Sequence, residues 1–392
     1  MPNEPEIVEL LSELCRLPSV NPEGRDLPAL AAPYGEERVA AFVERYFAAL
    51  GLGVERQSVH PGRDNVIVRL AGRAADAAPL CLEAHMDTVG PEGIADPFVP
   101  RVADGRLYAR GACDTKGSLA AMMLAVARLV RRGELPPRPV WLVAAADEEY
   151  GQTGVRRLVG EHRAFAGAIV GEPTALQVVP AHKGQFYLRI HARGKAAHSS
   201  APHNGINAIY AMADVVAVLR RRSERDYPAR RHPLCGSPVL TVSLIEGGIS
   251  EHIVPDACTI ALDRRTIPGE TTASAVEEIR RWLAEDLGSA ATSRLDVVTP
   301  HHDAPPMQTA PEHPLVRALH RAVEHTRGHA EIAGVPYNTD AGAFAAAGVP
   351  VVVFGPGDIA QAHAAVEYVA IAELQAAVDA LEWLLLHELE SW

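Results

Sequence analysis

The sequence predicts an α/β fold in which a largely parallel central sheet is interrupted by an inserted α+β domain. Two observations lead to this prediction. Strand-like and helix-like segments alternate over the first half of the chain and again after Pro300, which favours a parallel sheet covered on both faces. From about His182 the order becomes β-α-β-β-α-β, which is typical of a split βαβ sandwich. We therefore expect residues 1–181 and 299–392 to form one domain, and residues 182–298 an inserted one.

The first part of the chain contributes most of the predicted parallel strands. Helices are expected where apolar residues recur every three or four positions, and strands where short apolar runs lie between polar residues. The helices are predicted over 7–17, 36–50 and 117–132, and the strands over 65–70, 80–84, 140–145 and 168–170. Gly51 and Gly133 follow two of these helices, at the position where glycine commonly ends a helix.

The inserted part and the last part show the same two periodicities in a different order. In the inserted part, strands are predicted over 186–192, 239–245, 259–265 and 295–298, and helices over 207–222 and 272–287. Thr271 or Thr272 is the expected N-cap of the second helix. In the last part we expect a helix over 314–327, a strand over 349–354 and a helix over 371–389.

Composition and charge exclude several classes of protein. The 392 residues are 48% apolar and 22% charged, the balance of a soluble globular protein. With 37 Lys and Arg against 49 Asp and Glu, the formal net charge is −12, which argues against nucleic acid or an anionic membrane as a partner. The most apolar stretch, 343–354, is too short for a membrane span and contains Gly348 and Pro350.

The cysteines and the N-terminus favour a cytoplasmic protein. The chain has 5 cysteines, an odd number, and they form no C-x-x-C pair. The first residues are acidic and lack the basic and apolar regions of a signal peptide. A reduced, cytoplasmic setting is the simplest interpretation.

Acidic and imidazole side chains follow several of the predicted strands. These residues are His85, Asp87, Asp114, Asp147, Glu148, Glu149, Glu172 and His363. In an open α/β sheet, sites form in the crevice beyond the carboxyl ends of the strands, so residues far apart in sequence can converge there. Taken singly, each motif has an ordinary explanation, since a His-x-Asp or an Asp-Glu-Glu is usually a solvated surface segment.

Together, these side chains form a ligand set for metal ions. Two imidazoles with three carboxylates suit Zn²⁺ and tolerate Co²⁺ or Mn²⁺. Carboxylates crowded into one crevice repel each other, and a dication, or two that share a carboxylate, removes this repulsion. Two metals can hold one hydroxide and polarise a carbonyl, while a further carboxylate moves protons. Spacing alone therefore predicts a metal site.

The motifs, in their order along the chain, resemble those of the M20 metallopeptidase family. They are His85-Met-Asp-Thr-Val, Gly111-Ala-Cys-Asp-Thr-Lys-Gly, Asp147-Glu-Glu, Gly171-Glu-Pro-Thr and Gln361-Ala-His. This family includes acetylornithine deacetylase, succinyl-diaminopimelate desuccinylase, aminoacylase-1 and glutamate carboxypeptidase. The resemblance covers nearly the whole chain. It implies a zinc-exopeptidase-like catalytic domain in residues 1–181 and 299–392, with a ferredoxin-like lid and dimerisation domain in residues 182–298.

The resemblance also implies a role for each motif residue. One zinc ion would be held by His85, Asp114 and Glu172, and the second by Asp114, as a bridge, with Glu149 and His363. Glu148 would be the general base that takes a proton from the bridging water and later delivers it to the leaving amine. Asp87 would hydrogen-bond His85, and the peptide bond between Asp114 and Thr115 would be cis.

Four further residues are implied to act on the substrate. His198 would reach the active site of a partner subunit and stabilise the oxyanion, and Arg265 would bind the substrate carboxylate, for which a planar guanidinium is suited. His252 stands in a substrate loop where many relatives carry asparagine, and Gly355 would bring backbone close to the substrate. Simpler roles stay open: His198 as a lid surface residue, Arg265 as a partner of Asp263 only, and Gly355 as an ordinary turn residue.

The expected function is that of a dinuclear zinc amidohydrolase resembling acetylornithine deacetylase. It would remove an acyl group from an N-acyl amino acid by attack of a metal-bound hydroxide, with small-molecule or short-peptide substrates and a homodimeric assembly. One alternative is a dipeptidase or a glutamate carboxypeptidase-type exopeptidase that uses the same site. A second alternative is a non-catalytic binding protein on a hydrolase fold.

Overall fold

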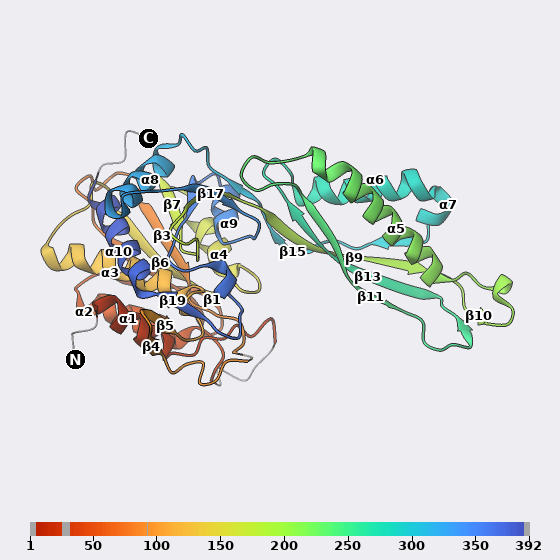
Figure 1. The fold of residues 1–392 in the computed structure, drawn as a ribbon, viewed down its shortest axis with the longest axis horizontal. Coiled ribbons are helices and arrows are strands. Elements are labelled where there is room, and N and C mark those ends of the chain that lie inside the picture. The colour runs from red at the N-terminus through yellow and green to blue at the C-terminus, as the bar shows by residue number, and fades with distance from the viewer. Residues whose placement is uncertain (1–4, 26–31, 92, 388–392) are drawn as a thin grey trace. The chain divides into compact units, whose positions relative to one another are not determined.

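The computed structural model describes residues 5–25, 32–91 and 93–387, and the chain divides into two compact units. Unit 1 comprises Met1–Ala181, Gln308–Gly334 and Thr339–Trp392, and unit 2 comprises His182–Met307 and Val335–Asn338 (Figure 1). The first stretch of unit 2 runs to Met307, beyond the expected residue 298, because strand β15 (His301–Ala304) pairs with another strand of unit 2.

The main sheet of unit 1 has nine strands in the order β1-β2-β6-β3-β7-β18-β8-β16, and β17 pairs with β8. Their bounds are Val54–His60 (β1), Arg63–Leu70 (β2), Leu80–His85 (β3), Val140–Ala145 (β6), Gly167–Val170 (β7), Val178–His182 (β8), Met307–Gln308 (β16), Ile332–Val335 (β17) and Val351–Val353 (β18). The four central strands, β6, β3, β7 and β18, run parallel, which confirms the predicted largely parallel α/β sheet. Strand β1 was not predicted, because its residues alternate only weakly between buried and exposed positions.

Helices cover both faces of this sheet (Figure 1). Their bounds are Glu6–Cys15 (α1), Glu37–Ala49 (α2), Lys116–Arg132 (α3), Thr153–Glu161 (α4), Pro314–Arg327 (α8), Ala341–Ala346 (α9) and Ile371–Leu386 (α10). Residues of α1, α2, α3, α8 and α10 share one apolar core with alternate residues of β3 and β6. On the other face, Phe344 of α9 lies edge-on to Phe165, whose ring also meets Trp141 of β6. Residues 388 and 389 of the last predicted helix lie outside the described residues.

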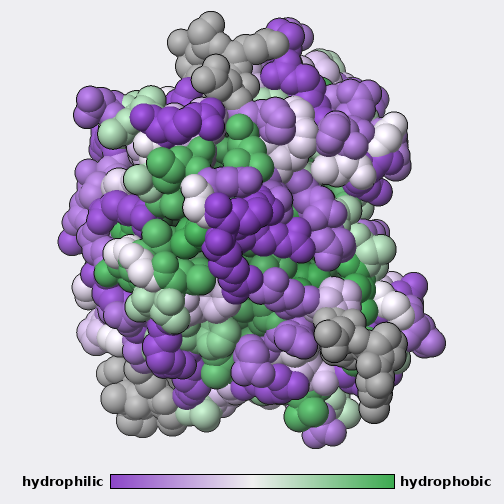
Figure 2. Space-filling model, turned by 90° about the vertical axis from the view of Figure 1, so that its left-hand side faces the viewer, coloured by the Kyte–Doolittle hydropathy of each residue, from purple (hydrophilic) through white to green (hydrophobic). Residues whose placement is uncertain are grey.

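Helix α3 shows how sequence and packing agree in unit 1. Gly133 ends it in the left-handed conformation (φ 67°), and Arg131 and Arg132 occupy the last turn, where cations favour the carboxyl end of a helix. Its residues from Lys116 to Ala127 are all buried, and it packs against α1 and α10. Figure 2 views the protein from the left-hand side of Figure 1. The surface seen there mixes apolar areas with hydrophilic side chains.

Unit 2 is built on a five-stranded antiparallel sheet with two long helices. The strands are β9 (Gly184–Arg193), β11 (Val239–Gly247), β13 (Ala257–Thr266), β14 (Leu295–Val297) and β15, in the order β11-β13-β9-β14 with β15 also beside β9. Alternate residues of β9, from Phe186 to Ala192, are buried in a core with helices α5 (Ala208–Asp226) and α6 (Thr272–Leu287). Thr271, and not Thr272, caps α6, and it forms a capping box with Ser274.

The remaining elements are short. They are β4 (Arg101–Ala103), β5 (Arg106–Tyr108) and β19 (Tyr368–Ala370) in one small sheet, β10 (Ala197–His198) paired with β12 (Ile253–Val254), α7 (Ser289–Thr292), and single 3-10 turns at Pro202–Asn204, Tyr227–Ala229 and Ile359–Gln361. None of the helices in the described part of the chain combines the length and apolar character that a membrane span needs.

Candidate metal centre

The predicted ligands and the predicted general base, Glu148, lie at one edge of the main sheet of unit 1. His85 is the last residue of β3, Glu148 and Glu149 follow β6, and Glu172 follows β7. Since β6, β3 and β7 are parallel neighbours, their carboxyl ends meet at the same edge. His363 comes from the loop after β18, and Asp114 from the loop before α3.

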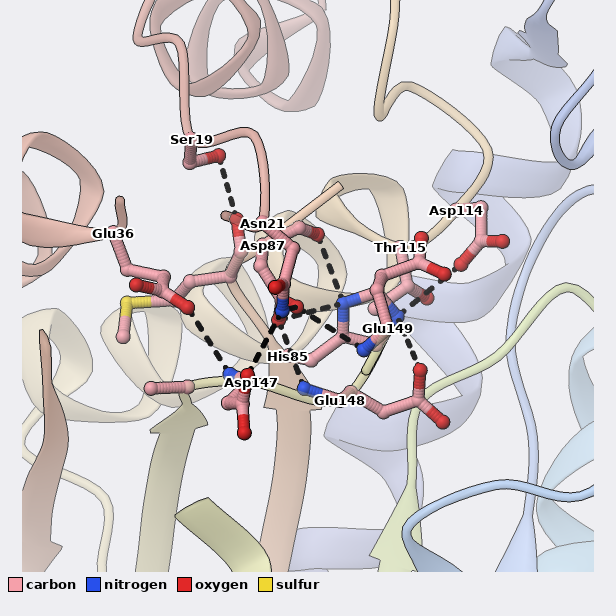
Figure 3. Close-up of polar contacts among 12 residues, drawn as sticks. Ser19, Asn21, Glu36, His85, Asp87, Asp114, Thr115, Asp147, Glu148 and Glu149 are labelled. Carbon is pink, nitrogen blue, oxygen red and sulfur yellow. Dashed lines mark hydrogen bonds and ion pairs between the residues drawn. The ribbon is translucent and has the colours of Figure 1, made fainter. Parts of the chain in front are cut away.

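Asp114 stands between the two imidazoles. Its Oδ1 lies 3.2 Å from Nε2 of His85, and its Oδ2 lies 3.4 Å from Nε2 of His363. His363 Nε2 is also 3.1 Å from Oε2 of Glu149, and His85 Nε2 is 3.8 Å from Oε1 of Glu172. Donor atoms of His85, Asp114 and Glu149 lie within 4.8 Å of one another, a spacing at which one ion could bind all three. Figure 3 labels these three residues, His85, Asp114 and Glu149.

Electrostatics favour a cation here. Burial raises the pKa of Glu172 well above its usual range, and the neighbouring Asp114 carboxylate raises it further. Burial likewise raises the pKa of Glu148. Hydrogen bonds to Asp114 and Glu149 raise the pKa of His363 to about 10. Burial and repulsion thus disfavour the ionised forms of Glu148 and Glu172. The mixed N and O donors fit one or two dications, which would remove the repulsion.

Asp87 contacts His85 mainly through its main-chain oxygen. The Nδ1 atom of His85 lies 3.0 Å from the main-chain oxygen of Asp87 and 3.5 Å from its Oδ1. A hydrogen bond from Nδ1 to a carbonyl leaves Nε2 free to bind metal. The Asp87 carboxylate accepts hydrogen bonds from the main-chain N–H groups of Glu148 and Glu149, both at 3.1 Å. Burial acts to raise its pKa, but His85, Asn21 and Arg63 together lower it.

A buried polar network extends from Asp87 into unit 1, and sequence reasoning missed it. Asn21 Nδ2 donates to Asp87 Oδ2 at 2.7 Å and to Asp147 Oδ1 at 3.0 Å (Figure 3). Arg63 binds the same Asp147 oxygen at 3.1 Å and binds Glu36 at 2.6 Å. The Asp147 carboxylate is therefore bound within this network and not to the proposed ligands. No local signal marks Asn21, because its partners lie 66 and 126 residues away.

The side-chain contacts of Glu148 and the conformation of the Asp114–Thr115 peptide bond complete the description of the predicted site. Glu148 Oε2 lies 4.0 Å from His85 Nε2, and its Oε1 accepts a hydrogen bond from Gln152 at 3.2 Å. The Asp114–Thr115 peptide bond is cis, which confirms that prediction.

Gly355 is buried, and its absent side chain is explained by packing within unit 1. A Cβ atom there would lie 2.3 Å from Ser118 Oγ and 2.5 Å from the main-chain oxygen of Glu172. Glycine is thus required for the close approach of this loop to the Glu172 loop, whatever its relation to a substrate.

Three predicted residues belong to unit 2. His198 is exposed, and its Nδ1 lies 2.7 Å from Ser200 Oγ. The main-chain oxygen of His252 accepts a hydrogen bond from Ser199 at 2.9 Å. Arg265 contacts Asp263 through two nitrogens, at 2.9 and 3.1 Å, and its Nη1 donates to Asn338 at 3.3 Å. Arg265 therefore forms the Asp263 pair that the sequence left open as its simpler role.

Comparisons with known proteins agree with the motifs. The model of peptidase family M20/M25/M40 matches residues 81–387. The chain is 34% identical over 348 residues to an acetylornithine deacetylase of Myxococcus xanthus, covering 85% of this chain and 87% of that one. It is 29% identical over 359 residues to an acetylornithine deacetylase of Vibrio vulnificus, covering 88% and 90%. The crystal structure of aminopeptidase PepT from Bacillus cereus has the same fold, with a TM-score of 0.79, 21% identity and 97% of each chain covered.

Proposed function

The chain belongs to peptidase family M20/M25/M40 and is a hydrolase that acts on amide bonds. From this premise, we propose that it removes the acyl group of an N-acyl amino acid at a dinuclear metal site. The observation that carries the proposal is the placement of Asp114, whose two carboxylate oxygens face two different imidazoles. A carboxylate in this position can serve two ions at once.

Two groups of residues would hold the ions. His85, Asp114 and Glu172 would hold one, and Asp114, Glu149 and His363 the other. When bound, the two divalent ions, Zn²⁺ or else Co²⁺ or Mn²⁺, supply Lewis acidity toward the amide carbonyl and toward a water molecule. Asp87 keeps the Glu148–Glu149 main chain in place through its two hydrogen bonds, so that both side chains face the same space.

Glu148 moves the proton. Its carboxylate accepts a proton from the attacking water while the water oxygen bonds to the amide carbon. The C–N bond then breaks, and Glu148 returns the proton to the departing nitrogen. The products are a carboxylic acid from the acyl group and a free amine on the amino acid; the acid then loses its proton, which the amine can take up. The hydrogen bond from Gln152 keeps one oxygen of Glu148 occupied and leaves the other toward His85.

Unit 2 is proposed to act as the lid and dimerisation domain. Its edge strand β11 exposes Leu244 and Ile245, which are 65% and 61% accessible, and Tyr210 of α5 is 73% accessible. A homodimer formed through unit 2 would cover this apolar surface. In such a dimer the exposed His198 could serve a partner's site, with Arg265 binding the substrate carboxylate and His252 lining the substrate loop. All five cysteines are free and buried, which supports a reducing, cytoplasmic setting.

The proposed deacylase and the alternative exopeptidase differ in the group that stands on the acyl side of the cleaved amide bond. Both curated relatives described above are acetylornithine deacetylases, whereas the structural neighbour is an aminopeptidase. Parallel assays of the Zn²⁺-loaded chain with N-acetyl amino acids, N-succinyl amino acids and dipeptides would separate the two. We expect turnover of an N-acetyl amino acid. Cleavage of dipeptides alone would show an exopeptidase, and no turnover of any amide would favour a binding protein.

A further inference from the structure

A buried ion pair in unit 1, Arg110–Glu367, lies beside the proposed ligands, although neither residue is one of them. Arg110 Nη1 and Glu367 Oε2 are 2.6 Å apart, and both residues are 2% accessible. The Glu367 carboxylate also accepts three main-chain hydrogen bonds from the loop that carries Asp114. The donors are the N–H groups of Gly111 at 3.0 Å, Cys113 at 2.9 Å and Asp114 at 3.0 Å. Both carboxylate oxygens therefore bind this one loop.

The remaining donors of Arg110 bind two other loops. Its Nε donates to the main-chain oxygen of Gly90 at 3.1 Å, and its Nη2 donates to that of Ala364 at 3.4 Å. Gly90 lies in the loop that follows His85, and Ala364 is the neighbour of His363. The ion pair thus contacts all three loops that carry His85, Asp114 and His363.

These loops need to be held together. Like charges at the site push the ligands apart, and His363 has a left-handed backbone (φ 57°), which costs a non-glycine residue free energy. A buried ion pair is tolerable only when its hydrogen-bonding groups are satisfied. Here they are satisfied by main-chain groups of the ligand loops, so the pair and the loops hold one another.

We propose that the Arg110–Glu367 pair is a positioning element of the metal site, which holds the three loops so that Asp114 faces His85 on one side and His363 on the other. The inference rests on the proposed function, because it presupposes that these three residues bind metal. Neither residue of the pair is a ligand, so each acts through Asp114 and His363. The competing explanation is a general contribution to folding.

The test is Co²⁺ binding to the metal-stripped full chain, followed by visible absorption and by competition with a chelator. Glu367→Gln keeps the side-chain volume but loses the charge and turns an amide group toward main-chain donors. We expect its Co²⁺ affinity to fall about 10–100-fold, the usual effect of losing a residue that supports a ligand, and its visible spectrum to change. Thermal unfolding of the stripped protein is measured in parallel.

Glu270→Gln is the matched control. In unit 2, Glu270 accepts a main-chain hydrogen bond from Ile267 at 3.2 Å and binds Arg264 at 3.0 Å and Arg230 at 3.1 Å. It is the same kind of carboxylate anchor, but it holds no ligand loop. We expect Glu270→Gln to lower the unfolding temperature without changing Co²⁺ affinity or the spectrum.

If Glu367→Gln does not fold, Arg110→Lys tests whether the ion pair positions the ligand loops. Lysine keeps the charge beside Glu367, but it lacks the fork that contacts Gly90 and Ala364 at the same time. We again expect weaker Co²⁺ binding in a folded protein. Wild-type affinity in the folded variants would overturn the positioning role alone. An equal loss of affinity in Glu270→Gln would also overturn it, since the effect would then follow stability. If the wild-type chain binds no Co²⁺, the proposed metal site fails and the positioning role with it.

Discussion

Buried carboxylates have different partners in unit 2 and at the sheet edge of unit 1. In unit 2 the fully buried guanidinium of Arg264 lies 3.0 Å from Glu270, and Arg230 lies 3.0 Å from Glu278, so carboxylates are matched by arginines. At the sheet edge of unit 1, Asp114, Glu148, Glu149 and Glu172 surround two imidazoles, and burial and mutual repulsion raise the pKa of Glu172. The buried carboxylates of unit 2 therefore have arginine partners within the fold, whereas those at the sheet edge of unit 1 would gain from a bound cation.

The largest expected effect is on kcat, from substitution of Glu148 at the sheet edge of unit 1. Glu148→Gln should lower kcat about 10²–10⁴-fold, the usual contribution of a general acid–base group, because no group then takes the proton of the attacking water. Bound metal should stay at the wild-type level, which elemental analysis can check. Unchanged kcat with full metal content would remove Glu148 from the mechanism.

In unit 2, the comparison predicts that breaking a matched pair harms folding only. Arg264→Leu removes the fully buried cation from Glu270 and Glu278 and leaves Glu270 with Arg230 alone, so the free energy of unfolding should fall by about 3 kcal/mol. Chemical denaturation measures this loss, and metal affinity should not change. A variant as stable as the wild-type protein would mean that the buried pair contributes nothing net to unit 2.

Metal addition should stabilise the units unequally. An ion that binds only the folded site at 100 times its Kd adds about 2.7 kcal/mol to the free energy of unfolding. Hydrogen exchange with and without Zn²⁺ should show this protection in β3, β6 and β7 and not in β9 or β13. Equal protection of both sheets would show that the two units unfold together, and no protection would contradict the metal site.

The smallest effect concerns a surface carboxylate of unit 2. Hydrogen bonds from Arg222 and Arg221 lower the pKa of Asp286. Its contribution to stability should therefore be present above the unfolded-state value of about 4 and be lost as the pH falls below it. Asp286→Asn should flatten this acid-side loss in an unfolding series at pH 2 to 5. An unchanged slope would show that the pair is fully screened by solvent.

How far the fold followed from sequence differs between elements. Helix α3 and the strands β3 and β6 were predicted within one residue, because their apolar spacing is regular and Gly133 marks the helix end. Strand β1 and the small sheet of β4, β5 and β19 were missed, since short, half-exposed strands carry little periodic signal.

What the sequence by itself determined is the set of chemical groups that follow the strands: His85, Glu148, Glu149 and Glu172 come after apolar runs, and parallel strands bring such positions to one edge. Only the tertiary structure decided which groups support them. Asp87 holds the Glu148 and Glu149 main chain, and Arg110 meets Glu367 across 257 residues. Local spacing encodes which face or end of an element a residue occupies, but the partner of a loop carboxylate depends on how distant loops pack, and no short-range pattern records that.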